Sequence, residues 1–98
     1  MNKQEIMQKA IKHYGIDSQL IKMQEECGEL ITAISKYFIA ARDDDLEIWE
    51  KMTENVREEI ADVNIMIQQM KHYGFDTDRI NEIEEYKLER LQKRLKDV

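Results

Sequence analysis

Two short acidic strings are the part of this sequence best suited to chemistry. One is Glu-Glu-x-x-Glu, which ends in Glu26 and Glu29, and the other is Glu-x-x-Asp, which begins at Glu59. Side chains three positions apart share one face of an α-helix, so Glu26 can converge with Glu29 on one point. The same spacing relates Glu59 to Asp62. Oxygen ligands without a neighbouring His or Cys favour a hard cation, so these four residues are predicted to bind Mg²⁺, with Mn²⁺ as an alternative.

Glu59 has an unusual place in its helix. It lies at the centre of an apolar stripe that contains Val56, Val63, Met66 and Met70. Burying several carboxylates together is unfavourable unless a positive charge accompanies them, and a divalent cation supplies that charge. A structural ion pair or a solvated acidic face is the alternative, because a chain with 13 Glu produces such strings by chance.

A cation held by carboxylates has open positions for phosphate oxygens, so the predicted chemistry is attack of water on phosphorus. Glu25 or Glu26 is predicted to accept the proton of that water. Three cations are candidate phosphate-binding residues: Lys36 on the acidic side of its helix, and Lys87 and Arg94 beside the apolar stripe of the last helix. Surface ion pairs, or side chains extended along apolar surface, are the alternative for these three.

Helical periodicity and capping residues place these side chains on four helices. Asn2 followed by Glu5 is typical of a capping box. Asp17 or Ser18 is predicted to cap the second helix and Thr53 the third. The expected helices span 3–14, about 18–41, 53–73 and, after a cap at Thr77, 77–95, with a loop at 42–52 that contains at most one helical turn.

A seven-residue pattern recurs at two helix ends, as IKHYGID and as MKHYGFD. Gly15 and Gly74 are both predicted to end a helix in the left-handed conformation. Ile16 and Phe75 are predicted to make the apolar contact that accompanies such an end. The recurrence is compatible with a duplicated helix pair, although helix ends also converge.

Composition restricts the class of protein. The 98 residues include no Pro, three Gly, 42% apolar and 37% charged residues, which is typical of a single all-α domain over 1–98, similar to a four-helix bundle. A net charge of -6 argues against duplex nucleic acid as a partner. No stretch is apolar enough for a signal peptide or a membrane span, so a cytoplasmic location is expected. A chain of this size has a modest core, so self-association is also expected.

The acidic strings and their surroundings resemble a known family. The segments QEECGELITAI at 24–34 and EEIADVNIMI at 58–67 are similar to the MazG-type all-α nucleoside triphosphate pyrophosphohydrolases, and nearly the whole chain fits. The resemblance implies cleavage of a nucleotide between its α and β phosphates, which gives a monophosphate and pyrophosphate. It also implies a helical bundle that forms a homodimer or homotetramer.

The resemblance carries over to individual residues. It implies that Glu25 is a water-activating or supporting residue. KLERLQKR at 87–94 keeps the Lys and Arg that related proteins often have on the last helix, but Leu91 replaces an Asn. The spacer of 29 residues between the strings is slightly long for the family. The Mg²⁺ ligands that the resemblance implies are Glu26, Glu29, Glu59 and Asp62.

Two further functions fit the same strings. One is a phosphoribosyl-ATP pyrophosphohydrolase, a relative with similar acidic strings, and the other is an acidic helical module that binds a partner helix without catalysis. Trp49 either stacks on a base or packs in the core, and core packing is favoured. Cys27 is expected in the core. His13 and His72 are expected to cover exposed carbonyls at helix ends. The sequence leaves base and sugar preference open.

Overall fold

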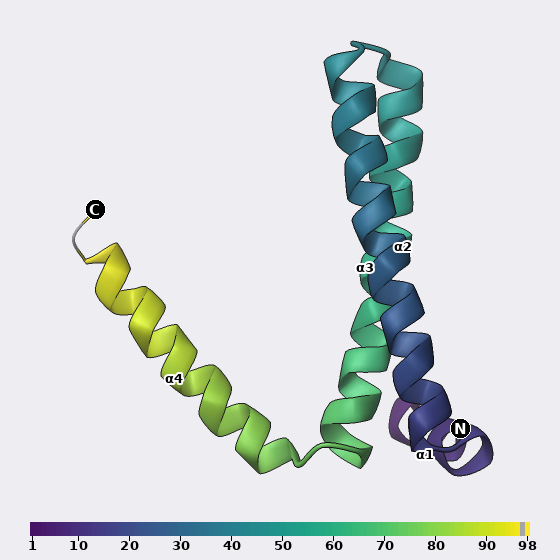
Figure 1. Cartoon of the computed structure of the whole chain (residues 1–98), viewed down its shortest axis with the longest axis vertical. Helices are drawn as coiled ribbons and strands as arrows, with labels where there is room; N and C mark the ends of the chain where they lie inside the picture. The colour runs from purple at the N-terminus through teal and green to yellow at the C-terminus, as the bar shows by residue number, and fades with distance from the viewer. Residues whose placement is uncertain (97) are drawn as a thin grey trace.

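A computed structural model describes residues 1–96 and 98, and within them the chain is entirely helical, with four helices and no strand. Figure 1 shows α2 and α3 side by side as a long antiparallel hairpin, with the short α1 across its open end and α4 leading away from it. The all-α prediction is confirmed. The helices are α1 (Lys3–Tyr14), α2 (Ile16–Arg42), α3 (Leu46–Tyr73) and α4 (Thr77–Leu95).

The core lies between α2 and α3. Small residues on α2, Ala33 and Ala40, allow the two helices to approach closely, and methionines fill the space between them. Near the open end, Gln69 Nε2 donates a hydrogen bond to Gln19 Oε1 at 2.5 Å, which joins the two helices through neutral amides. The buried apolar side chains are Met7, Ala33, Ala40, Val63, Met66 and Met70.

The connection between α2 and α3 is much shorter than expected. The prediction of a loop at 42–52 with Thr53 as the next N-cap is wrong, because α3 begins at Leu46. Asp45 is the N-cap, and its side chain accepts a hydrogen bond from the Ile48 amide at 3.2 Å. Thr53 instead lies within the helix, where its hydroxyl donates to the Trp49 carbonyl at 2.8 Å.

Two other caps also differ from the prediction. Asp17 and Ser18 lie in the first turn of α2, since the helix begins at Ile16, directly after Gly15. Asp76, and not Thr77, caps α4 by accepting from the Arg79 amide at 3.2 Å. The Thr77 hydroxyl donates back to the Lys71 carbonyl at 2.7 Å. The Asn2 cap of α1 is confirmed, with the Glu5 amide donating to the Asn2 side chain at 2.8 Å.

The two glycine turns have different conformations. Gly15 has the predicted positive φ, 87°, but its ψ of 154° lies outside the left-handed helical region. Gly74 has φ -133°, so the prediction is wrong there, and Asp76 has the positive φ in that turn. Close packing instead favours Gly74, because a Cβ at that position would lie 2.9 Å from Ile16 Cδ1 and 3.2 Å from the Met70 carbonyl oxygen. The recurring pattern therefore gives no structural support to duplication.

The fourth helix does not close a bundle within one chain. Among the described residues, α4 approaches α3 near their connecting turn and none of its side chains is buried. Bundle-like packing is confined to α1, α2 and α3. None of the helices in the described part of the chain is long and apolar enough to cross a membrane.

Candidate metal site

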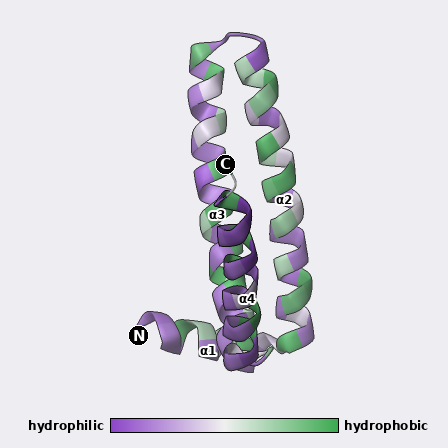
Figure 2. Cartoon of the chain, turned by 90° about the vertical axis from the view of Figure 1, so that its left-hand side faces the viewer, coloured by the Kyte–Doolittle hydropathy of each residue, from purple (hydrophilic) through white to green (hydrophobic). Residues whose placement is uncertain are grey.

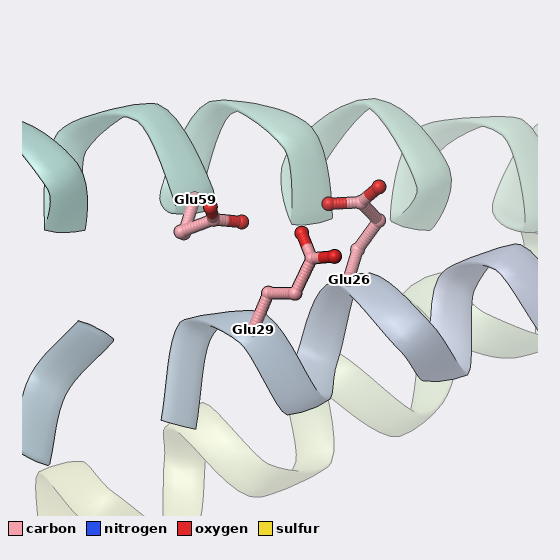
Figure 3. A group of neighbouring side chains, drawn as sticks. All are labelled: Glu26, Glu29 and Glu59. Carbon is pink, nitrogen blue, oxygen red and sulfur yellow. The ribbon is translucent and has the colours of Figure 1, made fainter. Parts of the chain in front are cut away.

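Three of the predicted ligands meet between the two long helices. Glu26 and Glu29 of α2 and Glu59 of α3 each offer a carboxylate oxygen, and these oxygens all lie within 4.8 Å of one another. Figure 3 shows the three carboxylates directed toward the space between the helices. Because α2 and α3 run antiparallel, acids 30 residues or more apart in sequence reach the same level of the hairpin. We refer to these residues as the Glu cluster.

The Glu cluster holds carboxylate oxygens that lack a partner. Glu26 is buried, with 7% of its surface exposed. Within residues 1–96 and 98, Glu26 Oε2 and Glu59 Oε2 are buried and accept no hydrogen bond. The other Glu26 oxygen, Oε1, lies 3.2 Å from Nζ of Lys22, which is itself half-exposed. A buried carboxylate oxygen without a partner costs free energy, so this cluster needs a further positive charge.

The pKa values in the cluster report the same excess of negative charge. Burial raises the pKa of Glu59 above its ordinary value, and the neighbouring charges of Glu29, Asp62 and Glu26 raise it further. The hydrogen bond between Lys22 and Glu26 raises the pKa of Lys22, and the negative charge of Glu26 raises it further. The surroundings of Glu59 therefore oppose its ionisation, and a nearby cation would favour it.

The cluster fits a hard divalent cation. Oxygen ligands lie about 2.1 Å from Mg²⁺, so two ligands of one ion are at most about 4.2 Å apart. The separations in the cluster, within 4.8 Å, are only slightly wider. All three donors are carboxylates, and two of them have oxygens free to bind. The donor set suits Mg²⁺ or Mn²⁺ and is unsuited to metals that prefer nitrogen or sulfur.

Asp62 lies at the edge of this arrangement. Its side chain is exposed and is outside the group of converging oxygens. It is still close enough for its charge to raise the pKa of Glu59. A step of three residues turns a helix by 300°, which displaces Asp62 from the buried face on which Glu59 lies. Its role as a metal ligand stays a prediction.

A shallow groove runs along one side of the hairpin beside the cluster. Of the predicted residues, Glu25 and Lys36 line it together with Glu29 and Glu59. Glu25 is also 3.9 Å from Lys22 Nζ, and its side chain is 60% exposed, so it remains accessible to solvent. The groove therefore brings a solvent-accessible carboxylate, Glu25, and a cation, Lys36, to the cluster. Its remaining lining residues are Gly28, Thr32, Ala33 and Asn55.

Two of those lining residues were missed by the sequence analysis. Thr32 lies three positions after Glu29, and Asn55 lies four positions before Glu59, so each shares a helix face with a cluster residue. That spacing was the available signal. Both are neutral hydrogen-bonding side chains, so they add polar contacts to the groove without adding charge.

The two cations predicted on the last helix are not brought to the groove. Lys87 and Arg94 lie on the exposed α4, which leads away from the hairpin in Figure 1. They share a helix face with Leu91, at spacings of four and three residues. Within one chain they are remote from the Glu cluster, and phosphate binding by them stays a prediction.

The structure also shows where the other residues that the sequence singled out lie. Trp49 is half-buried, and its ring lies 5.8 Å from that of Tyr37, which agrees with packing between α2 and α3. Cys27 is a free, half-buried thiol on α2. His13 and His72 lie in the last turns of α1 and α3, as expected.

Comparison with known proteins gives no match: no family model, curated protein or solved structure is similar to this chain. The resemblance of the acidic strings to the MazG-type family therefore stays a prediction. The features that bear on function are the geometry of the Glu cluster and the groove beside it.

Proposed function

We propose that this protein is a Mg²⁺-dependent nucleoside triphosphate pyrophosphohydrolase, with Mn²⁺ as an alternative metal. Water and a ribo- or deoxynucleoside triphosphate would give the monophosphate and pyrophosphate. The observation that carries the proposal is the Glu cluster, in which two helices bring together three carboxylates and leave two buried oxygens without a partner. The acidic strings that supply these residues also resemble the MazG-type family.

Glu26, Glu29 and Glu59 would hold the cation, and Asp62 at the edge of the cluster would join them or bind its water. The cation, when bound, neutralises phosphate charge and lowers the barrier to attack by an oxygen nucleophile. The pKa of Glu59, raised by burial and by its acidic neighbours, would fall when this cation binds, because the positive charge favours the ionised carboxylate. Metal binding and charge at the site are therefore coupled.

The groove supplies the remaining roles. Glu25, exposed and beside the cluster, would accept a proton from the attacking water as its oxygen bonds to the α phosphorus. The bond from that phosphorus to the α–β bridging oxygen breaks, and pyrophosphate leaves. Lys36 in the same groove would bind the phosphate oxygens. Thr32 and Asn55 would hydrogen-bond the substrate.

We also propose that the enzyme acts as a homodimer or homotetramer. Lys87 and Arg94 lie on a helix that does not return to the groove of its own chain. A role for them in phosphate binding would require α4 to reach the groove of another copy.

The test is pyrophosphate release from a panel of ribo- and deoxynucleoside triphosphates, with Mg²⁺ and with chelator. Wild type is compared with Glu59→Gln and with Glu58→Gln, which removes the same charge one position away on the exposed side of α3. Loss of a direct ligand should lower the rate at least about 100-fold, since loss of residues that only support a ligand costs about 10–100-fold. Equal activity of both variants would contradict the proposal. Adding phosphoribosyl-ATP to the panel tests the related activity.

A further inference from the structure

A cation of the chain itself contacts the Glu cluster. Nζ of Lys22 lies 3.2 Å from Glu26 Oε1 and 3.9 Å from Glu25 Oε2. Among the described residues, no other Lys, Arg or His nitrogen lies within 4.0 Å of a carboxylate oxygen of Glu26, Glu29 or Glu59. In that part of the chain, one ammonium group therefore compensates in part for three converging carboxylates.

This ion pair contributes little to the stability of α2 as a helix. A pair at this spacing is most favourable when the acid precedes the base, and here Lys22 precedes Glu26 by four positions. Hydrophobic residues recur along α2 (Figure 2), and Lys22 is the one charged residue between positions 18 and 24. The Glu26 side chain is 9% exposed, whereas Glu82, which pairs with Arg79, is 67% exposed. The buried charge of Glu26 is therefore the better explanation of the pair.

Lys22 and a divalent cation would use the same carboxylate. Glu26 Oε1 faces the ammonium group, and Glu26 Oε2 is buried without a partner. A cation about 2.1 Å from either oxygen would lie close to the ammonium group, and the two positive charges repel each other. Lysine carries a compact charge on a flexible stem, and the Lys22 side chain is 51% exposed. It can therefore leave Glu26 for the exposed Glu25 or for water.

We infer that Lys22 is an internal counter-ion of the Glu cluster: it stabilises the buried Glu26 carboxylate before a metal binds, and it lowers the affinity of the cluster for that metal. Lys22 is a positioning residue in this role, since it acts through Glu26 and not on a substrate. The inference rests on the metal site of the proposed function, but it does not depend on hydrolysis. Its two consequences are opposite in sign, because removing Lys22 should strengthen metal binding and weaken the metal-free fold.

The first test is calorimetric titration of the full-length protein with Mg²⁺ and with Mn²⁺, without nucleotide. Lys22→Met should bind each metal about tenfold more tightly than wild type, because a unit charge close to a divalent ion changes its binding by about that factor even in water. Lys22→Arg keeps the charge and should bind no more tightly than wild type. Arg79→Met is the matched control, since it removes one positive charge and an exposed ion pair from α4.

The second test is thermal melting in chelator. Lys22→Met should melt at least about 4 °C below wild type, because Glu26 keeps its buried charge without a partner, whereas Arg79→Met should melt close to wild type.

Unchanged or weaker metal binding by Lys22→Met, tighter binding by Lys22→Arg, or equal melting of Lys22→Met and Arg79→Met in chelator would overturn the inference. Pyrophosphate release is scored separately. A wild type that binds metal but releases no pyrophosphate contradicts the hydrolase proposal alone. Metal binding that is unchanged in Lys22→Met contradicts the counter-ion alone, and a wild type that binds neither metal contradicts both.

Discussion

The two sides of the α2–α3 hairpin are formed by the same two helices but differ in chemistry. On the groove side, acids flank the buried seam, and two carboxylate oxygens of the Glu cluster have no partner although Lys22 pairs with Glu26. The other side of the hairpin, the apolar side, is formed by Ile31, Ile34 and Phe38 of α2 with Ile60 of α3. These side chains are exposed, and no other helix in the described part of the chain covers them. A helix of 3.6 residues per turn can present three faces, one to its partner helix and one to each side. The two sides therefore lack different things: the groove side lacks a further cation, and the apolar side lacks a covering surface.

The largest expected effect distinguishes the two sides by two measurements, pyrophosphate release and oligomeric mass. Glu26→Gln removes a charge from the most buried carboxylate of the cluster and should lower Mg²⁺-dependent pyrophosphate release at least about 100-fold, while the oligomeric mass stays that of wild type. Ile31→Glu should instead lower the oligomeric mass. Light scattering and the release assay on both variants check this. A Glu26→Gln protein that loses mass would show that the two sides are not separate.

The next effect concerns stability. Mg²⁺ or Mn²⁺ at about 100 times its dissociation constant should add about 2.7 kcal/mol to the free energy of unfolding, because only the folded chain assembles the cluster. Thermal melts with metal and with chelator measure this. The increment should vanish in Glu59→Gln and persist in Glu58→Gln. A melting temperature that does not respond to either metal would favour a non-catalytic acidic module.

A smaller effect is expected from the cation of the groove. Lys36→Met should raise KM about tenfold, since a hydrogen bond to a charged group contributes about 1.5–3 kcal/mol. Lys3→Met, which removes an exposed Lys from the first turn of α1, is the matched control. Steady-state kinetics on the preferred nucleotide distinguish them. Equal KM values in the two variants would remove Lys36 from the site.

The smallest effect tests the electrostatics of the metal-free cluster. The pKa of Glu59 in the folded protein is raised above its ordinary 4.5. The folded state therefore binds this proton more tightly than the unfolded state does, and the wild type loses stability as pH rises through the raised pKa. Glu59→Gln avoids that loss. In chelator, the variant should match wild type below pH 4.5 and exceed it at neutral pH. Urea denaturation across this range measures the difference.

Much of the fold followed from local signals. The N-cap at Asn2 and the end of α1 at Gly15 were predicted because both depend on neighbouring residues. The start of α3 was not, since Asp45 and Thr53 are both good caps, and the packing of Trp49 near Tyr37 in the earlier turns is a contact between helices that local signals do not show. Gly74 was misjudged because its role is contact with Ile16, 58 positions away.

The candidate site was predictable where it depends on one helix. The spacing within each acidic string placed Glu26 and Glu29 at the border of one apolar stripe and Glu59 at the centre of another, and these three converge, with Glu26 buried, Glu59 half-buried and Glu29 exposed. Thr32 and Asn55 were missed because a groove depends on which residues of two helices lie opposite each other. The place of Lys87 and Arg94 was not predictable, because no local signal within their helix specifies the direction in which α4 leaves α3.

The amide pair near the open end of the hairpin sets the register of the site. Gln19 lies seven residues before Glu26, and Gln69 lies seven residues after Asp62, a distance of about 10.5 Å along each helix. The hydrogen bond between the amides therefore aligns Glu26 with Asp62, and Glu29 with Glu59, at equal heights on antiparallel helices. Sliding one helix by a single turn, about 5.4 Å, would separate the carboxylates by more than one ion can span. Because both amides are neutral, this alignment holds whether the carboxylates are protonated, ionised or bound to a metal.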